Sequence, residues 1–101
     1  MALFSRKNIK KSAQRALIDL LDNGGVYTRY GIYHSYTVET VMYFIPWLIN
    51  KIEEEDLDIN EVCNYLKRNA PREFCVEHLK FSYDKIKWFC ADLAKIIETE
   101  L

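Results

Sequence analysis

Apolar residues recur at the spacing of an α-helix in four stretches of this chain, which predicts a largely helical protein. In the first stretch, residues 8–22, the apolar positions share one helical face, and Gly24 follows where a left-handed residue commonly ends a helix. Segments 59–69 and 83–99 show the same pattern. The positions expected to be buried in these three helices are Ile9, Ala13, Ala16, Leu17, Leu20, Leu21, Ile59, Val62, Cys63, Leu66, Ile86, Phe89, Cys90, Leu93, Ile96 and Ile97. Trp88 falls on the opposite, polar side of the last helix, and Ile18 on the polar side of the first.

The fourth apolar stretch, residues 38–54, contains a proline. Its expected buried face consists of Val38, Val41, Met42, Ile45, Leu48, Ile49 and Ile52, and Phe44 is expected to complete the core. Because proline removes one backbone hydrogen bond, we expect a helix that is kinked at Pro46. The alternative is a strand over 36–45, followed by a helix with Pro46 at its first position.

Residues that commonly begin or end helices stand between these stretches. Asp56 or Asp58 is expected to cap the helix at 59–69, and Ser82 the last helix. The Ala70–Pro71 pair is expected to end the helix at 59–69, because the residue before a proline avoids the helical conformation. Segment 71–80 is then a short helix or an irregular crossover.

The connector at 26–37 is rich in tyrosine. Its tyrosines recur every third residue, which matches neither the period of a strand nor a stable helical stripe. We interpret it as an ordered loop, and the alternative is a short hairpin within 26–45 in an α+β fold. Only five residues of the chain are Gly or Pro, which disfavours a many-stranded fold with its frequent turns. The prediction is an all-α fold, a small four-helix bundle-like domain that spans residues 1–101.

Aromatic residues are concentrated in one part of the chain, where seven rings occur in residues 27–47. Tyr, Trp and Arg are enriched at the energetic centres of protein interfaces, because they combine a large apolar area with a polar group. Four tyrosines at a three-residue spacing cannot all face inward. The candidate protein-binding residues are Tyr27, Arg29, Tyr30, Tyr33, Tyr36, Tyr43, Trp47 and Trp88.

Charge is distributed unevenly, although the net charge is only −1. Residues 1–16 carry five basic and no acidic side chains. A basic helix face can follow a phosphate backbone, so nucleic-acid binding is the alternative function. Its candidate residues are Lys7, Lys10, Lys11 and Arg15.

The cysteines suggest a weaker alternative, a zinc-stabilised helical module. Cys63, Cys75, His78 and Cys90 are suitable zinc ligands, but only the central Cys-x-x-His pair has the spacing of a zinc site. Buried free cysteines usually behave as small hydrophobic residues. We therefore expect no metal and no cofactor.

Nothing in the sequence predicts catalysis or a membrane span. No serine or cysteine nucleophile motif is present, and the longest apolar run, Val41 to Ile49, has nine residues, whereas about 20 are needed to cross a bilayer. The odd number of cysteines favours a reducing, cytoplasmic location. The predicted function is a non-catalytic protein-binding module: an adaptor, or a small regulatory or inhibitor protein of the kind that phages and mobile elements carry. A homo-oligomer is a further expectation.

Overall fold

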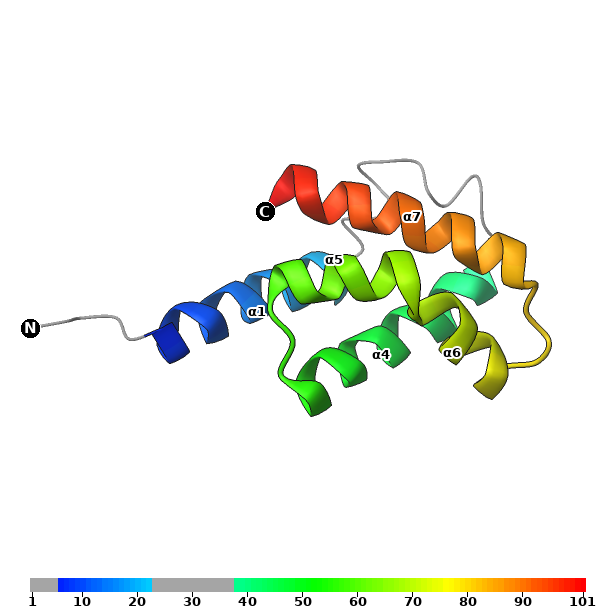
Figure 1. Ribbon diagram of the computed structural model, residues 1–101, viewed down its shortest axis with the longest axis horizontal. Coiled ribbons are helices and arrows are strands. Elements are labelled where there is room, and N and C mark those ends of the chain that lie inside the picture. Colours follow the sequence, from blue (N-terminus) through cyan, green and yellow to red (C-terminus); the bar gives the residue numbers. More distant parts are fainter. Residues whose placement is uncertain (1–5, 23–37) are drawn as a thin grey trace, which may run out of the picture.

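The computed structural model describes residues 6–22 and 38–101, and these residues form five helices and no strand (Figure 1). The helices are α1 (Arg6–Asp22), α4 (Val38–Glu55), α5 (Ile59–Arg68), α6 (Ala70–Glu77) and α7 (Tyr83–Glu100). The predicted all-α, bundle-like fold is confirmed. The connector at 26–37, which holds five of the candidate binding residues, lies outside the described residues. These five are Tyr27, Arg29, Tyr30, Tyr33 and Tyr36.

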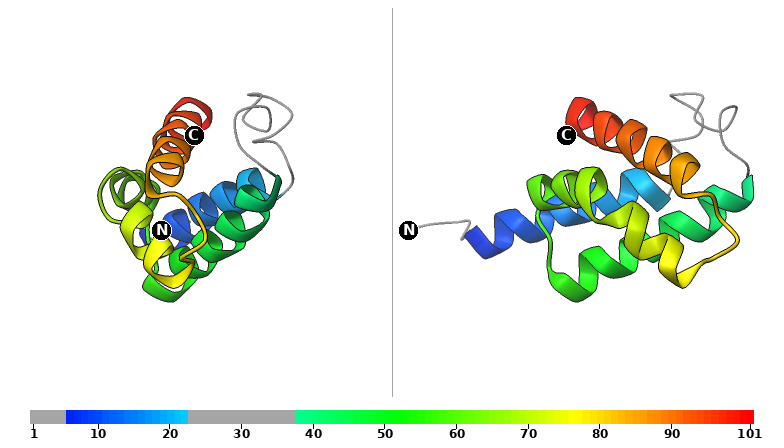
Figure 2. Two further views of the ribbon diagram at one scale, coloured as in Figure 1. Left: turned by 90° about the vertical axis from the view of Figure 1, so that its right-hand side faces the viewer. Right: turned by 45° about the vertical axis from the view of Figure 1, so that its right-hand side comes forward.

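The helices cover one another in two groups. Helices α5 and α6 both pack against α7, whereas α1 packs against α4 and also touches α5. Figures 1 and 2 show α4 on the far side of the molecule from α7, and the N-terminal half of α1 projecting past the other helices. One hydrophobic core joins all five helices, so the two groups form a continuous interior.

Three phenylalanines from three helices form the centre of this core. Phe44 of α4 lies 5.0 Å from Phe74 of α6 and 5.2 Å from Phe89 of α7, measured between ring centroids. All three side chains are fully buried. The six positions predicted to be buried in the last helix are buried as well, so the interior face of α7 is predicted correctly.

The interior face of α1 differs from the prediction. Leu17 and Leu21 are buried, but Ile9 is 57% exposed and Ala16 is exposed. Ile18, expected on the polar side, is half-buried against the core. The expected stripe was wrong at Ile9 because the N-terminal half of the helix extends beyond the other helices. Around Leu17 the interior face lies closer to Ile18 than predicted, which leaves Ala16 exposed.

Helix α4 continues through Pro46, so a strand over 38–45 is excluded. Pro46 is exposed, and the carbonyl group that loses its helical donor, that of Met42, can therefore face solvent. Val38 and Met42, both predicted to be buried, are exposed. Among the described helices, none is long and apolar enough to span a lipid bilayer.

The N-termini of α5 and α7 show which of the predicted capping residues form capping hydrogen bonds. Asp58, one of the two predicted candidates, caps α5 through a reciprocal pair: its carboxylate accepts from the Glu61 backbone N–H at 2.8 Å, and its own N–H donates to Glu61 Oε1 at 3.0 Å. Ser82 occupies the N-cap of α7, but its side chain makes no capping hydrogen bond.

The break after α5 has a different cause from the predicted one. Ala70 is itself helical, and α6 restarts there with Pro71 in its first turn, where no backbone N–H is required. The segment predicted as a short helix or a crossover is therefore the helix α6 followed by a turn.

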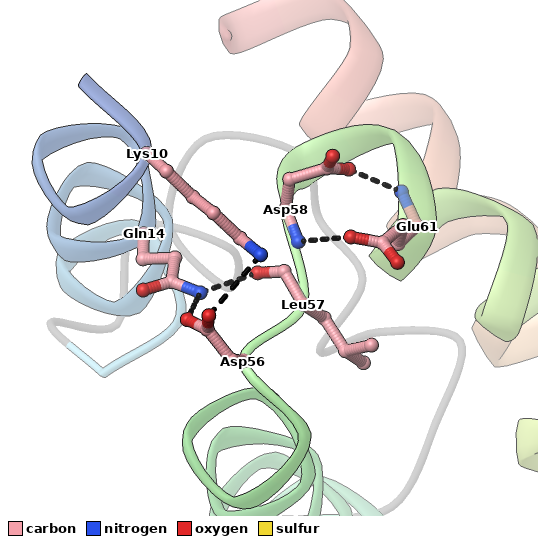
Figure 3. A network of polar contacts seen from close by, with 6 residues as sticks. All are labelled: Lys10, Gln14, Asp56, Leu57, Asp58 and Glu61. Carbon is pink, nitrogen blue, oxygen red and sulfur yellow. Dashed lines mark hydrogen bonds and ion pairs between the residues drawn. The ribbon is translucent and has the colours of Figure 1, made fainter. Parts of the chain in front are cut away.

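A network of hydrogen bonds, shown in Figure 3, connects α1 to the turn between α4 and α5. The Asp56 carboxylate accepts from Gln14 Nε2 at 2.9 Å and pairs with Lys10 Nζ at 3.2 Å, and Gln14 also donates to the Leu57 carbonyl at 2.7 Å. We call these four residues the clasp. Asp56 has a φ of 53°, a left-handed conformation that reverses the chain between the two helices.

Candidate functional site

Aromatic side chains extend from the core to the surface between α4 and α6. We call this group the aromatic strip; its members are Tyr43, Trp47, Tyr65, Phe74, His78 and Phe81. Phe74 is its buried centre, and its ring centroid lies 5.3 Å from both Trp47 and Phe81. Because Phe74 also packs on the core ring of Phe44, the strip is held in a fixed orientation.

One end of the strip is formed by Tyr43 of α4 and by the turn before α7. Tyr43 is 47% exposed, and its ring lies 5.9 Å from that of Phe81. Lys80 lies over both rings, with its Nζ 4.3 Å from the centroid of Tyr43, and it pairs with Glu39. The hydrogen bond to Glu39 raises the pKa of Lys80, so this side chain is a cation at neutral pH.

The other end of the strip contains Trp47 and Tyr65, which are half-buried and stacked with an interplanar angle of 20°. The Trp47 indole N–H donates to Glu77 Oε2, and the Tyr65 hydroxyl donates to Glu73 Oε1, both at 2.8 Å. Each ring is thereby fixed to a carboxylate of α6. The polar groups of both rings are satisfied, and parts of the rings remain accessible.

Trp88, the third described candidate, lies apart from the strip. Its side chain is 69% exposed on α7, and no ring contact connects it to Tyr43 or Trp47 within the described parts of the chain. Single exposed apolar residues are common on protein surfaces, whereas contiguous ones are typical of interfaces. The structure therefore brings Tyr43 and Trp47 into one surface and leaves Trp88 on another.

The basic residues of α1 are accompanied by acidic partners. Lys10 is paired with Asp56 in the clasp. Lys11 and Arg15 are exposed, but they line an open hollow of about 450 Å³ whose wall also includes Asp19 and Glu53. The side chain of Lys7 lies outside the described residues. This surface carries mixed charge, which disfavours a continuous phosphate contact.

The four candidate zinc ligands are not assembled into a site. The described residues 6–22 and 38–101 contain no group of three or more His, Cys, Asp or Glu side chains that could hold a metal ion. Cys63 and Cys90 are buried in the core, and His78 stacks on Phe74 with ring centroids 4.3 Å apart. The spacing in sequence was misleading because the thiols pack as hydrophobic groups.

Four of the six residues of the aromatic strip were missed by sequence reasoning. The residues not singled out as binding residues belong to different helices or turns, and only the fold brings them together; they are Tyr65, Phe74, His78 and Phe81. Two local signals were available: Trp47 and Lys51, and Phe74 and His78, are each four residues apart, a spacing that places side chains on one face of a helix.

Comparisons with known proteins identify no relative. No protein-family model, curated protein or solved structure matches this chain.

Proposed function

We propose that this chain is a non-catalytic protein-binding module, an adaptor or a small regulatory or inhibitor protein, that binds its partner through the aromatic strip. The observation that carries the proposal is the continuity of the strip: rings from three helices and a turn form one surface, partly exposed, above a buried phenylalanine. Tyr43 and Trp47, two of the residues expected to bind from the sequence, belong to it.

Rigid, partly buried aromatic side chains suit binding for a physical reason. A side chain already held in one orientation loses little conformational entropy when a partner covers it, so more of the contact energy contributes to affinity. Packing on Phe74 and hydrogen bonds to Glu73 and Glu77 hold Trp47 and Tyr65 in this way. Trp and Tyr are also the residue types that most often dominate interface energies.

The thiols argue against one catalytic chemistry, attack by a cysteine nucleophile. Burial raises the pKa of Cys63, Cys75 and Cys90 above the ordinary value, so all three remain protonated at neutral pH. A thiol nucleophile requires the thiolate form. Nucleic-acid binding through α1 is the alternative, and the pairing of Lys10 with Asp56 weakens it.

The proposed function can be tested by site-specific photo-cross-linking in the cells that produce the chain. A photoreactive phenylalanine analogue replaces Tyr43 in one variant, Trp88 in a second and the exposed Lys95 in a third, which serves as the control. We expect a discrete cross-linked protein from position 43 and none from position 95. Equal labelling from positions 43 and 95 would contradict a binding role for the strip, and labelling from position 88 alone would assign binding to the outer face of α7.

A further inference from the structure

The Trp47 end of the aromatic strip is surrounded by carboxylates without counter-ions. Glu73 and Glu77 each use one oxygen to accept a hydrogen bond from a ring, which leaves the second oxygen of each available to a ligand. Glu55, at the end of α4, adds a third negative charge, which acts on Tyr65 through electrostatics. Within the described part of the chain, none of these three glutamates forms an ion pair.

The electrostatic field at this end is correspondingly negative. The pKa of the Tyr65 hydroxyl is raised, first by burial, then by its hydrogen bond to Glu73 and by the charges of Glu73, Glu55 and Glu77. Among the described residues, one cation approaches the rings at this end: Lys51 Nζ lies 5.8 Å from the centroid of Trp47. At the other end of the strip, the Tyr43 ring likewise has a lysine over it, Lys80, which also pairs with a carboxylate.

These contacts define the chemistry of the ligand. A ring face with a carboxylate at its edge attracts a cation through the ring quadrupole and through charge. Arginine fits this combination better than lysine, because its planar guanidinium stacks on aromatic rings and donates in parallel to a carboxylate.

We propose that Trp47, Tyr65 and the carboxylates of Glu73 and Glu77 bind an arginine side chain of the partner protein. This inference rests on the proposed function, and it specifies the partner: a protein that presents an exposed basic segment. Lys51 occupies part of the site in the free protein, and the arginine displaces it from the Trp47 ring.

The site can be tested with a synthetic peptide and the fluorescence of a single tryptophan. The chain has two tryptophans, so Trp88→Phe leaves Trp47 as the only one. The probe is a blocked peptide with three arginines separated by Gly-Ser pairs, and the control peptide carries uncharged citrulline at the same positions. We expect a saturable change in Trp47 emission with the arginine peptide and binding at least about ten-fold weaker with citrulline.

Variants of the glutamates and of Lys51 make the test specific to this site. Glu77→Gln and Glu73→Gln remove a charge but keep an oxygen that accepts from the ring, and each is expected to weaken binding about five-fold. Asp84→Asn, on α7, removes the same charge elsewhere and should leave affinity within about two-fold. Lys51→Ala should strengthen binding about three-fold, because the internal competitor is gone.

Three results would overturn the inference. One is the absence of a saturable change in Trp47 emission at millimolar peptide. Another is an equal loss of affinity in Glu77→Gln and Asp84→Asn, which would indicate nonspecific charge attraction. The third is a dimer in light scattering that Lys11→Ala and Arg15→Ala dissociate, which would assign the site to a second copy of the chain. If cross-linking from position 43 persists in the first two cases, the proposed function stands and only the arginine site fails. In the third case, a cross-link from position 43 to a protein other than this chain is needed for the proposed function to stand.

Discussion

Helix α4 is held on its two sides by contacts of different kinds. Toward α6 its rings join Phe74 and the aromatic strip, where every contact involves a large side chain that is buried or half-buried. Toward α1, Leu17 and Leu21 supply the buried contacts, and the clasp of Asp56 adds polar contacts at the surface. Apolar packing depends little on pH or salt, whereas exposed ion pairs depend on both. Contacts on the α6 side should therefore contribute most to the free energy of unfolding. Contacts on the α1 side should determine how easily α1 separates from α4.

The largest effect is expected from the centre of the strip. Phe74→Ala removes a fully buried ring that contacts Phe44 and Trp47, and it should lower the free energy of unfolding by about 3–5 kcal/mol, as measured by urea denaturation. Leu17→Ala is the matched substitution on the α1 side, and it should lower the free energy of unfolding by a smaller amount. A greater loss for Leu17→Ala would reverse the comparison between the two sides.

The two tryptophans give the next largest contrast. Trp47→Ala removes a half-buried ring and its hydrogen bond to Glu77, so we expect a loss of about 2 kcal/mol in the free energy of unfolding. Trp88→Ala should change it by less than about 0.5 kcal/mol, because the side chain is 69% exposed. Chemical denaturation of both variants checks this prediction. Equal losses would show that Trp88 is also part of the core.

Some parts of the fold and of the site can be predicted from the sequence, and others cannot. Periodicity predicts α7 and its interior face, because a long helix against a core shows its burial in its apolar spacing. It fails for Ile9, since whether a helix end is covered depends on how far the other helices extend. The candidate site is predictable only in part, because some of its residues are close in sequence and others are not. Tyr43 and Trp47 stand out as an aromatic excess within one segment, but their neighbours Tyr65 and Phe81 come from elsewhere in the chain, and only the fold brings these rings together.

Changes in the clasp should have a smaller effect on stability, and one that is concentrated in α1. Asp56→Ala removes the acceptor for Gln14 and Lys10 and places alanine in a left-handed conformation that it disfavours. We expect a melting temperature lower by a few degrees and a larger increase in amide hydrogen exchange in α1 than in α7. Asp56→Asn keeps the left-handed preference and an oxygen acceptor, so its effect should be smaller. An equal increase of exchange in α7 would show that the clasp supports the whole fold.

The smallest effect is the dependence of the clasp on pH, and it separates charge from packing most directly. Hydrogen bonds from Gln14 and Lys10, with the charge of Lys10, hold the pKa of Asp56 below its ordinary value of 3.8. A carboxyl group whose pKa is lower in the folded state stabilises that state above its unfolded pKa, and this contribution is lost as the pH falls through the folded pKa. The melting temperature of the native chain should therefore exceed that of Asp56→Asn at pH 6, and the difference should shrink below about pH 4.

Glu54→Gln, which changes the same charge on an exposed residue of α4, serves as the control for this titration. The difference in melting temperature between Glu54→Gln and the native chain should not shrink comparably below about pH 4. Exchange in α1 should follow the same pH dependence, while ring contacts in the aromatic strip persist. If the difference for Asp56→Asn stays constant down to pH 2, the charge of Asp56 does not contribute to holding α1. Both sides of α4 would then depend mainly on apolar packing. They would differ in how much surface they bury and not in the type of contact.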